Sequence, residues 1–303
     1  MNNGQSTENG KLDLVEILLL AVIGALLFVL FQLQGNTTVV AFYSRSVFSW
    51  MVNRWNDATL SVGDYSHGWL IPIVSAAAIW WKRRELAATP RAAAAKALWI
   101  VGLGLLLHFV GARGQQPRIS LFGLVLLLWG IPFYLYGRLF AKLLIFPCFY
   151  LIFCIPFNFL DSLSFRLRIF ATSISAAVLN GINIGVERSG SAIYSTLPGG
   201  FNLDVADPCS GIRSLLAMTA LTVAYAHFTQ KGLLKKTFLS LLSIPLAVIG
   251  NIARIISIAT VANFFGHGPA MRFYHDYSGY VVFAVAVLLM MWVGGLLSRE
   301  RSL

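Results

Sequence analysis

Long apolar stretches alternate with short polar or basic segments along this chain of 303 residues. A helix needs about 20 mainly apolar residues to cross the hydrocarbon core of a bilayer, and several stretches reach or approach that length. The transmembrane helices are expected at about 14–33, 67–82, 97–112, 119–137, 142–158, 209–228, 237–263 and 279–297. The pattern predicts an all-α integral membrane protein of about eight transmembrane helices, in one polytopic domain over residues 1–303.

Three further segments do not have the pattern of a membrane span. Residues 38–56 are aromatic but interrupted by arginines, and residues 160–184 are amphipathic, so both are expected to be interfacial helices. Residues 185–206 contain short alternating runs with Gly, Ser and Thr, which predict a small two-stranded hairpin. We expect an extracytoplasmic insertion at about 159–208.

Composition supports the same class, because 57% of the residues are hydrophobic and only 12% are charged. The net charge of +11 is compatible with nucleic acid or with an anionic membrane surface as partner. The basic residues cluster between the apolar spans, which favours membrane lipids and the positive-inside rule over nucleic acid. In the eight-span arrangement with both termini in the cytoplasm, every lysine lies on the cytoplasmic side. Arg113 and Arg118, in a short outer loop, are the main exceptions to the positive-inside rule. Residues 1–10 are polar and the first span is too long for a signal peptide, so no cleavable signal is expected.

This orientation places the polar groups that look chemical at the outer ends of four spans. We therefore expect a shared site at the outer membrane face. The candidates are Tyr65, His67, Asp207, Cys209, Arg213, Asn251, Arg254, His275 and Asp276.

The run DPCSGIRSL, from Asp207 to Leu215, is the most informative of these segments. Asp207 is a good N-cap and Pro208 a good first helical residue, so Cys209 is expected in the first turn of a helix. The helix dipole and Arg213, four residues later, favour the thiolate, whereas Asp207 opposes it. A lone cysteine at a helix start is more often structural, but this setting favours a nucleophile. Cys148 and Cys154 lie in one apolar run and are expected to be buried small hydrophobes.

For each of the other candidates, a purely structural role is the alternative to a functional one. Arg254, with Asn251 three residues earlier on the same helical face, would lie too deep for snorkelling, which favours a function. His275 is either an aromatic-belt residue or part of the site, and His67 is expected to support it. His108, His227 and His267 have no motif around them and are expected to be structural. No CxxC or HExxH spacing occurs, so neither a metal nor another cofactor is expected.

Four motifs together resemble the exosortase/archaeosortase family of membrane transpeptidases, in its bacterial exosortase branch. They are YSHGWLIPI, VADPCSGIRSL, IGNIARI and FYHDYSGYVVF. The resemblance implies that Cys209, Arg254 and His275 are catalytic, at the outer side of the bacterial inner membrane. It also implies substrates with a C-terminal sorting signal, which consists of a short motif such as Pro-Glu-Pro, a transmembrane helix and a basic tail. This branch is linked to extracellular polysaccharide.

On this reading Cys209 forms a thioacyl enzyme, His275 is the acid and then the base, and Arg254 stabilises the oxyanion. The acceptor, whether water, a lipid or a glycan, and the oligomeric state are left open. Two other classes also stay open. A transporter fits the eight spans and the Pro and Gly breaks at 155–156 and 244–250, although the polar groups gather near one face. The other class is an envelope assembly scaffold with a non-catalytic Cys209.

Overall fold

The computed structural model describes residues 13–35, 45–56, 65–156, 160–198, 200–204, 212–266, 268 and 275–299. The chain forms two compact units. The N-terminal unit comprises residues 1–57 and 65–157, and the C-terminal unit comprises residues 58–64 and 158–303. Each unit is described by itself.

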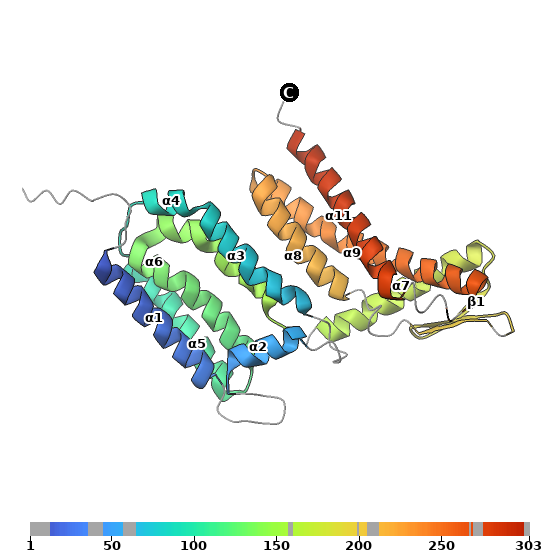
Figure 1. The fold of residues 1–303 in the computed structure, drawn as a ribbon, viewed down its shortest axis with the longest axis horizontal. Helices are drawn as coiled ribbons and strands as arrows, with labels where there is room; N and C mark the ends of the chain where they lie inside the picture. The colour runs from blue at the N-terminus through green and yellow to red at the C-terminus, as the bar shows by residue number, and fades with distance from the viewer. Residues whose placement is uncertain are drawn as a thin grey trace, which may run out of the picture. The chain divides into compact units, whose positions relative to one another are not determined.

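The N-terminal unit is entirely helical in its described part (Figure 1). Its elements are α1 (Leu14–Leu33), α2 (Val47–Asn56), η1 (Ser66–Trp69), α3 (Leu70–Trp81), α4 (Arg83–Ala88), η2 (Ala95–Ala97), α5 (Leu98–Arg113), α6 (Pro117–Tyr150) and η3 (Leu151–Cys154). The bounds of α1 equal those of the first expected span. Helix α1 starts there because Asp13 caps it and Glu16 bonds back to the Asp13 N–H, which completes a capping box.

Helix α6 is a helical hairpin whose two arms correspond to the two spans expected at 119–137 and 142–158. Gly137, at φ +87°, makes the turn between the arms. Trp129 Nε1 on the first arm donates a 2.9 Å hydrogen bond to the Ala141 carbonyl on the second. The turn is held by the segment after α4, because the N–H groups of Ala92 and Ala94 donate to the carbonyls of Tyr136 and Tyr134.

Helices α5 and α6 pack closely because glycines line their contact. A Cβ at Gly123 would come within 2.5 Å of the Gly104 carbonyl oxygen, and one at Gly111 equally close to Ser120. Small residues allow transmembrane helices to approach backbone to backbone. Phe31 of α1 and Trp50 of α2 cover the first arm of α6 in the main core of this unit.

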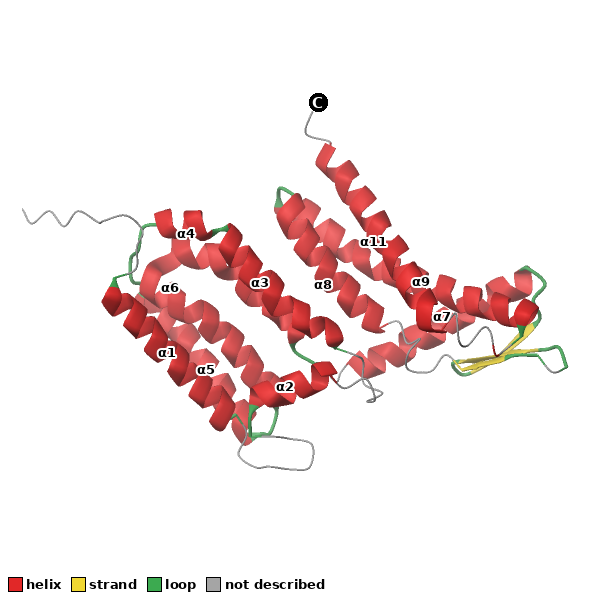
Figure 2. Ribbon diagram, in the orientation of Figure 1, coloured by secondary structure: helices red, strands yellow, loops and turns green. Residues whose placement is uncertain are grey.

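The C-terminal unit combines long helices with a small sheet (Figure 2). Its elements are α7 (Leu160–Gly181), β1 (Val186–Ser189), β2 (Ala192–Ser195), β3 (Asn202–Asp204), α8 (Ile212–Thr229), α9 (Leu233–Phe265) and α11 (His275–Arg299). The prediction of a two-stranded hairpin is wrong: β3 adds a third antiparallel strand to β2. The residue pairs between β2 and β3 centre on Ile193 and Leu203, whose side chains are both buried.

Two apolar cores hold this unit together. In the first, α7 and the sheet pack against the C-terminal part of α9, around Ile193, Ile255 and Ile258. In the second, α8, α9 and α11 pack around Met218, Leu239 and Met290. At the end of this three-helix bundle that carries Lys231 and Lys235, the Gln230 amide donates to the Gly294 carbonyl at 2.9 Å.

Within the described residues, five helices are long and apolar enough to cross a membrane. They are α1, α5 with the preceding η2, α6 with the following η3, α9 and the part of α11 from Val281 to Ser298. Helix α8 contains a shorter apolar stretch. The predicted all-α membrane fold is confirmed, whereas the number of eight spans is not.

Candidate functional site

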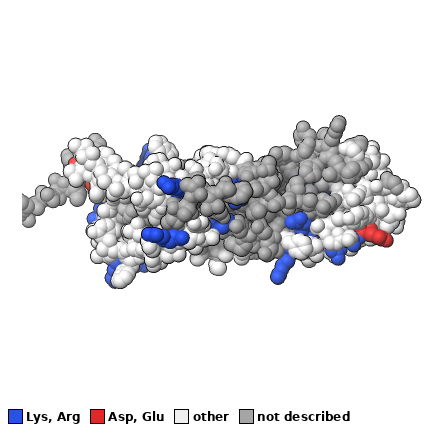
Figure 3. Space-filling model, turned by 90° about the horizontal axis from the view of Figure 1, so that it is seen from below, with Lys and Arg blue, Asp and Glu red and all other residues white. Residues whose placement is uncertain are grey.

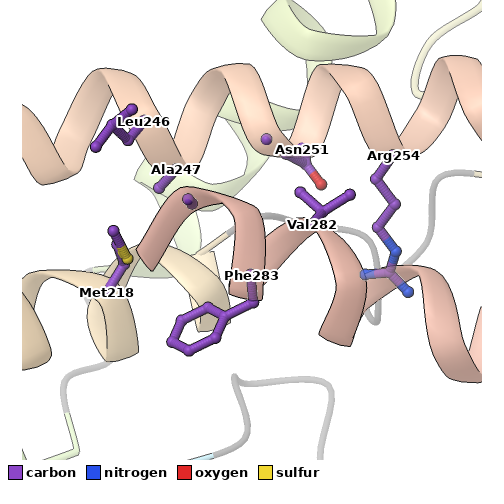
Figure 4. Close-up of a pocket in the computed structure, with 9 residues that line it drawn as sticks. Met218, Leu246, Ala247, Asn251, Arg254, Val282 and Phe283 are labelled. Carbon is purple, nitrogen blue, oxygen red and sulfur yellow. The ribbon is translucent and has the colours of Figure 1, made fainter. Parts of the chain in front are cut away.

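A small pocket in the C-terminal unit brings Arg254 and Asn251 together (Figure 4). Its volume is about 40 Å³, which suits a few water molecules or one small group and no large ligand. The half-buried Arg254 and the buried Asn251 supply its polar atoms from α9. The other lining residues come from α8, α9 and α11 and are Met218, Leu246, Ala247, Gly250, Val282, Phe283 and Ala286.

Helical periodicity on α9 places these polar groups. Ala247, Asn251 and Arg254 follow one another at intervals of four and three residues, so they share one face of the helix. Gly250 lets α11 approach that face, because a Cβ there would lie 2.9 Å from Val282 Cγ1. The pocket is therefore the space between two closely packed helices, with an amide and a guanidinium in an apolar wall.

Helices α9 and α11 run antiparallel at the pocket. The direction of α11 therefore decides which of its ends lies on the side of Arg254. In Figure 4, Leu246 lies at one end of the pocket, and Arg254 lies at the other end, beyond Val282. His275 is the first residue of α11, seven residues before Val282, which is about 10 Å along a helix axis. Arg254 therefore lies toward the end of α11 that begins with His275.

The guanidinium suits a partner with negative charge. Arginine presents up to five N–H donors and no acceptor, and the neighbouring Asn251 adds an amide that can donate. In a mainly apolar pocket such donors act more strongly than in water. The arrangement can stabilise an oxygen that gains negative charge during a reaction.

Three other predicted site residues lie at the starts of helices in the C-terminal unit. Arg213 lies in the first turn of α8, and His275 and Asp276 open α11, but the structure describes only their backbone. Cys209 and Asp207 lie outside the described residues. Helix α8 begins at Ile212.

Tyr65 and His67 lie in the N-terminal unit, at and inside the short helix η1. Tyr65 is 4% exposed, and its ring centroid is 5.6 Å from that of His67. Gly68 donates its N–H to the Tyr65 carbonyl at 2.7 Å and lies against the Trp55 indole. The YSHG motif thus forms a compact turn that packs against the Trp55 indole.

The structure adds seven pocket residues that the sequence reasoning missed, and Met218, Val282 and Phe283 are among them. The sequence gives only a weak signal for such residues, because apolar side chains occur on several faces of α8 and α11. The burial of Cys148 and Cys154, at 6% and 5% exposure, confirms the prediction for these two thiols. Among the described residues, no group of three or more His, Cys, Asp or Glu side chains is arranged to hold a metal ion.

Comparison with known proteins identifies one family. No curated protein and no solved structure matches the chain. The family model described as transmembrane exosortase matches residues 55–292, well over half of the sequence and including every motif segment named above. The chain therefore belongs to the transmembrane exosortase family, as a multi-pass membrane protein with a transpeptidase-type role in protein sorting.

Proposed function

We propose that this exosortase is a cysteine transpeptidase of the bacterial inner membrane, with its active site on the periplasmic side. Its substrates are exported proteins with a C-terminal sorting signal made of a short motif such as Pro-Glu-Pro, a transmembrane helix and a basic tail. In this proposal residues 1–303 act together as one membrane protein, and the two compact units are its parts. The observation that carries the proposal is the position of Arg254, in a pocket of α9 far along the helix from the lysines near its start.

The length of α9 supports this position. Eighteen residues separate Lys236 from Arg254, which corresponds to about 27 Å along a helix. A hydrocarbon core is about 30 Å thick. With Lys235 and Lys236 at the cytoplasmic surface, Arg254 falls at the outer edge of the bilayer.

The sheet supports the same depth independently. Ile255, Ile258 and Ala262, just beyond Arg254, pack against α7 and the three-stranded sheet. A small sheet with open edges does not occur within lipid, because its unpaired backbone groups need water. In this proposal the last turns of α9 lie outside the bilayer and Arg254 lies at the boundary, which is shallower than the depth expected from the sequence.

The N-terminal unit supports the orientation. The turn of the α6 hairpin, followed by Arg138 and Lys142, bonds to the segment that carries Arg91. Arg91 also forms a 2.7 Å ion pair with Glu16 at the start of α1. These basic residues gather at one end of the unit, as the positive-inside rule expects of the cytoplasmic side.

The chemistry follows from the three proposed catalytic residues. The Cys209 thiolate attacks the carbonyl carbon at the cleavage point, and the carbon–nitrogen bond breaks to leave a thioacyl enzyme. His275 gives a proton to the leaving amine and later takes one from the incoming nucleophile, which attacks the thioester and releases the thiol. Arg254 stabilises the oxyanion, a contribution of about 3–4 kcal/mol for one such donor.

The remaining site residues have supporting roles in this proposal. Arg213 either tunes the thiol or binds the acidic residue of the sorting motif. Asn251 orients Arg254 or adds an amide donor to the pocket. The other supporting residues are Tyr65, His67, Asp207 and Asp276.

The decisive experiment uses a reporter protein with a sorting signal, expressed together with this chain. The Cys209→Ala variant should lose cleavage of the reporter while it keeps its expression and its thermal stability. Wild type should form a covalent adduct with the reporter that hydroxylamine releases, as expected of a thioester. A matched Cys148→Ala variant should cleave normally. Cleavage by Cys209→Ala at the wild-type rate would refute the mechanism and favour a transporter or a scaffold.

A further inference from the structure

A second, larger groove lies in the C-terminal unit where α7 meets β1. Its volume is about 420 Å³, within the range of small-molecule sites. Its lining residues are Phe165, Arg166, Ile169, Phe170, Ser173 and Arg188. Two of them are arginines from different elements, and none is acidic. Figure 3 shows basic side chains on the surface of this unit.

The strand register explains why Arg188 turns toward α7. Arg188 pairs with Ile193 on the neighbouring strand, and Ile193 is fully buried in the core against α7. Directly paired residues share one face of a sheet, whereas neighbours along a strand lie on opposite faces. Arg188 is therefore on the α7 side, and the adjacent Glu187 is on the other side. The alternation keeps this carboxylate out of the groove.

The guanidinium of Arg188 is held in place but keeps donors to spare. One of its nitrogens, Nη1, donates a 2.8 Å hydrogen bond to the Gly190 carbonyl in the β1–β2 turn. Within the part of the chain that the structure describes, neither Arg166 nor Arg188 forms an ion pair. Two guanidinium groups in one groove repel each other, so an anion that contacts both is favoured.

The rim of the groove is apolar. Phe165 and Phe170 of α7 are 56% and 53% exposed, which is unusual for large aromatic side chains unless they meet lipid or a partner. Both lie on the same helix as Arg166. Exposed aromatic rings beside arginines are typical of helices at the water–lipid boundary.

We propose that this groove binds the anionic headgroup of a membrane phospholipid. Arg166 and Arg188 hold the phosphate, Ser173 donates a further hydrogen bond, and Phe165 and Phe170 contact the start of the acyl chains. Arginine suits this task because its fork of donors matches the oxygens of a phosphate. The proposal is independent of the peptide chemistry assigned to Cys209, so either can fail alone.

The test uses the full chain in nanodiscs that contain photoreactive phosphatidylglycerol in a phosphatidylcholine background. After illumination, the labelled peptides are mapped by mass spectrometry. We expect labelling of residues 165–173, and a loss of about tenfold or more in the Arg166→Gln/Arg188→Gln variant, since each charged hydrogen bond contributes about tenfold in affinity. The matched control is Lys231→Gln, an exposed charge of the same unit, which should label as wild type.

Two further arms separate the lipid from a free anion. Millimolar inorganic phosphate should compete poorly, and Phe165→Ser/Phe170→Ser should reduce labelling while both arginines stay in place. Thermal unfolding of every variant verifies its fold, and single Arg166→Gln and Arg188→Gln variants replace the double variant if that one unfolds. Labelling that is unchanged without the arginines would overturn the proposal. Full competition by inorganic phosphate would overturn the choice of a lipid.

Discussion

The indole Nε1 of Trp55 donates a 2.9 Å hydrogen bond to the carbonyl oxygen of Cys154, across 99 residues of sequence. This buried bond ties the end of α2 to the end of the α6–η3 segment. Gly68 of the YSHG motif packs against the same indole. Trp55 therefore links the motif that carries Tyr65 and His67 to the α6–η3 segment of the N-terminal unit.

Replacement of Trp55 by Phe should destabilise the protein. The variant keeps an apolar ring but leaves the Cys154 carbonyl without this donor, at a cost of about 1–3 kcal/mol for a buried group. Thermal unfolding in detergent measures the change. Trp69→Phe is the control: its indole donates to the Asn56 side chain at 3.1 Å but is 47% exposed, so its loss should matter less. An equal loss of stability in both variants would contradict this account.

Gly68→Ala should be harmful because the new methyl group would collide with the Trp55 indole ring. Overpacking of this kind costs about 1–3 kcal/mol. Gly102→Ala, in α5, is the matched change, because nothing lies within 4 Å of its new Cβ. Thermal unfolding of the two variants should therefore differ clearly. If YSHG also supports catalysis, Gly68→Ala will lower reporter cleavage even at temperatures where the variant is folded.

Gly137→Ala should disrupt the turn of the α6 hairpin. Its φ of +87° is unfavourable for alanine, and the new Cβ would strike the Ala92 carbonyl oxygen. This φ, with ψ at −175°, lies in a region that is essentially restricted to glycine and costs another residue about 1–3 kcal/mol. Gly24→Ala in α1, with open space around it, should instead be neutral or stabilising by up to about 1 kcal/mol. Opposite signs in the two unfolding temperatures are the expected result, and equal signs would contradict the hairpin.

Arg254→Ala should lower the cleavage rate by about 10²–10³, the usual loss for one donor to an oxyanion. Arg254→Lys keeps the charge but loses the planar fork, so it should restore little of the rate. Single-turnover cleavage of the reporter measures both variants. Arg84→Ala, an exposed arginine of the N-terminal unit, serves as control. A normal rate in Arg254→Ala, with a normal unfolding temperature, would remove Arg254 from the mechanism.

A membrane-impermeant thiol reagent applied from outside the inner membrane should label Cys209 and spare Cys148 and Cys154. The latter two side chains are buried, so they are shielded whatever the orientation. A Cys148→Ala/Cys154→Ala variant should label to the same extent as wild type, since Cys209 is then the single thiol. Labelling that requires access from the cytoplasm would invert the proposed topology.

Local sequence signals placed most of the helices. The capping residues and the uniform apolar run explain why the bounds of α1 were predicted correctly. The break in hydropathy near Gly137 separated the two arms of α6, although they form one hairpin. The third strand was missed because Leu203 joins the sheet through pairing with Ile193, a contact that no local pattern encodes.

The sequence by itself determined that the chain spans the membrane, because apolar length is a local property, and its motifs supplied the residues that we propose for the chemistry. It also placed Asn251 and Arg254 on one helical face, through the period of the helix. Only the tertiary structure decided that Val282, Phe283 and Met218 form the wall around them, and that Arg166 and Arg188 line one groove. Those relationships depend on which faces of distant segments pack together. Many helix faces in this chain are similarly apolar, so the local sequence does not specify which of them will meet.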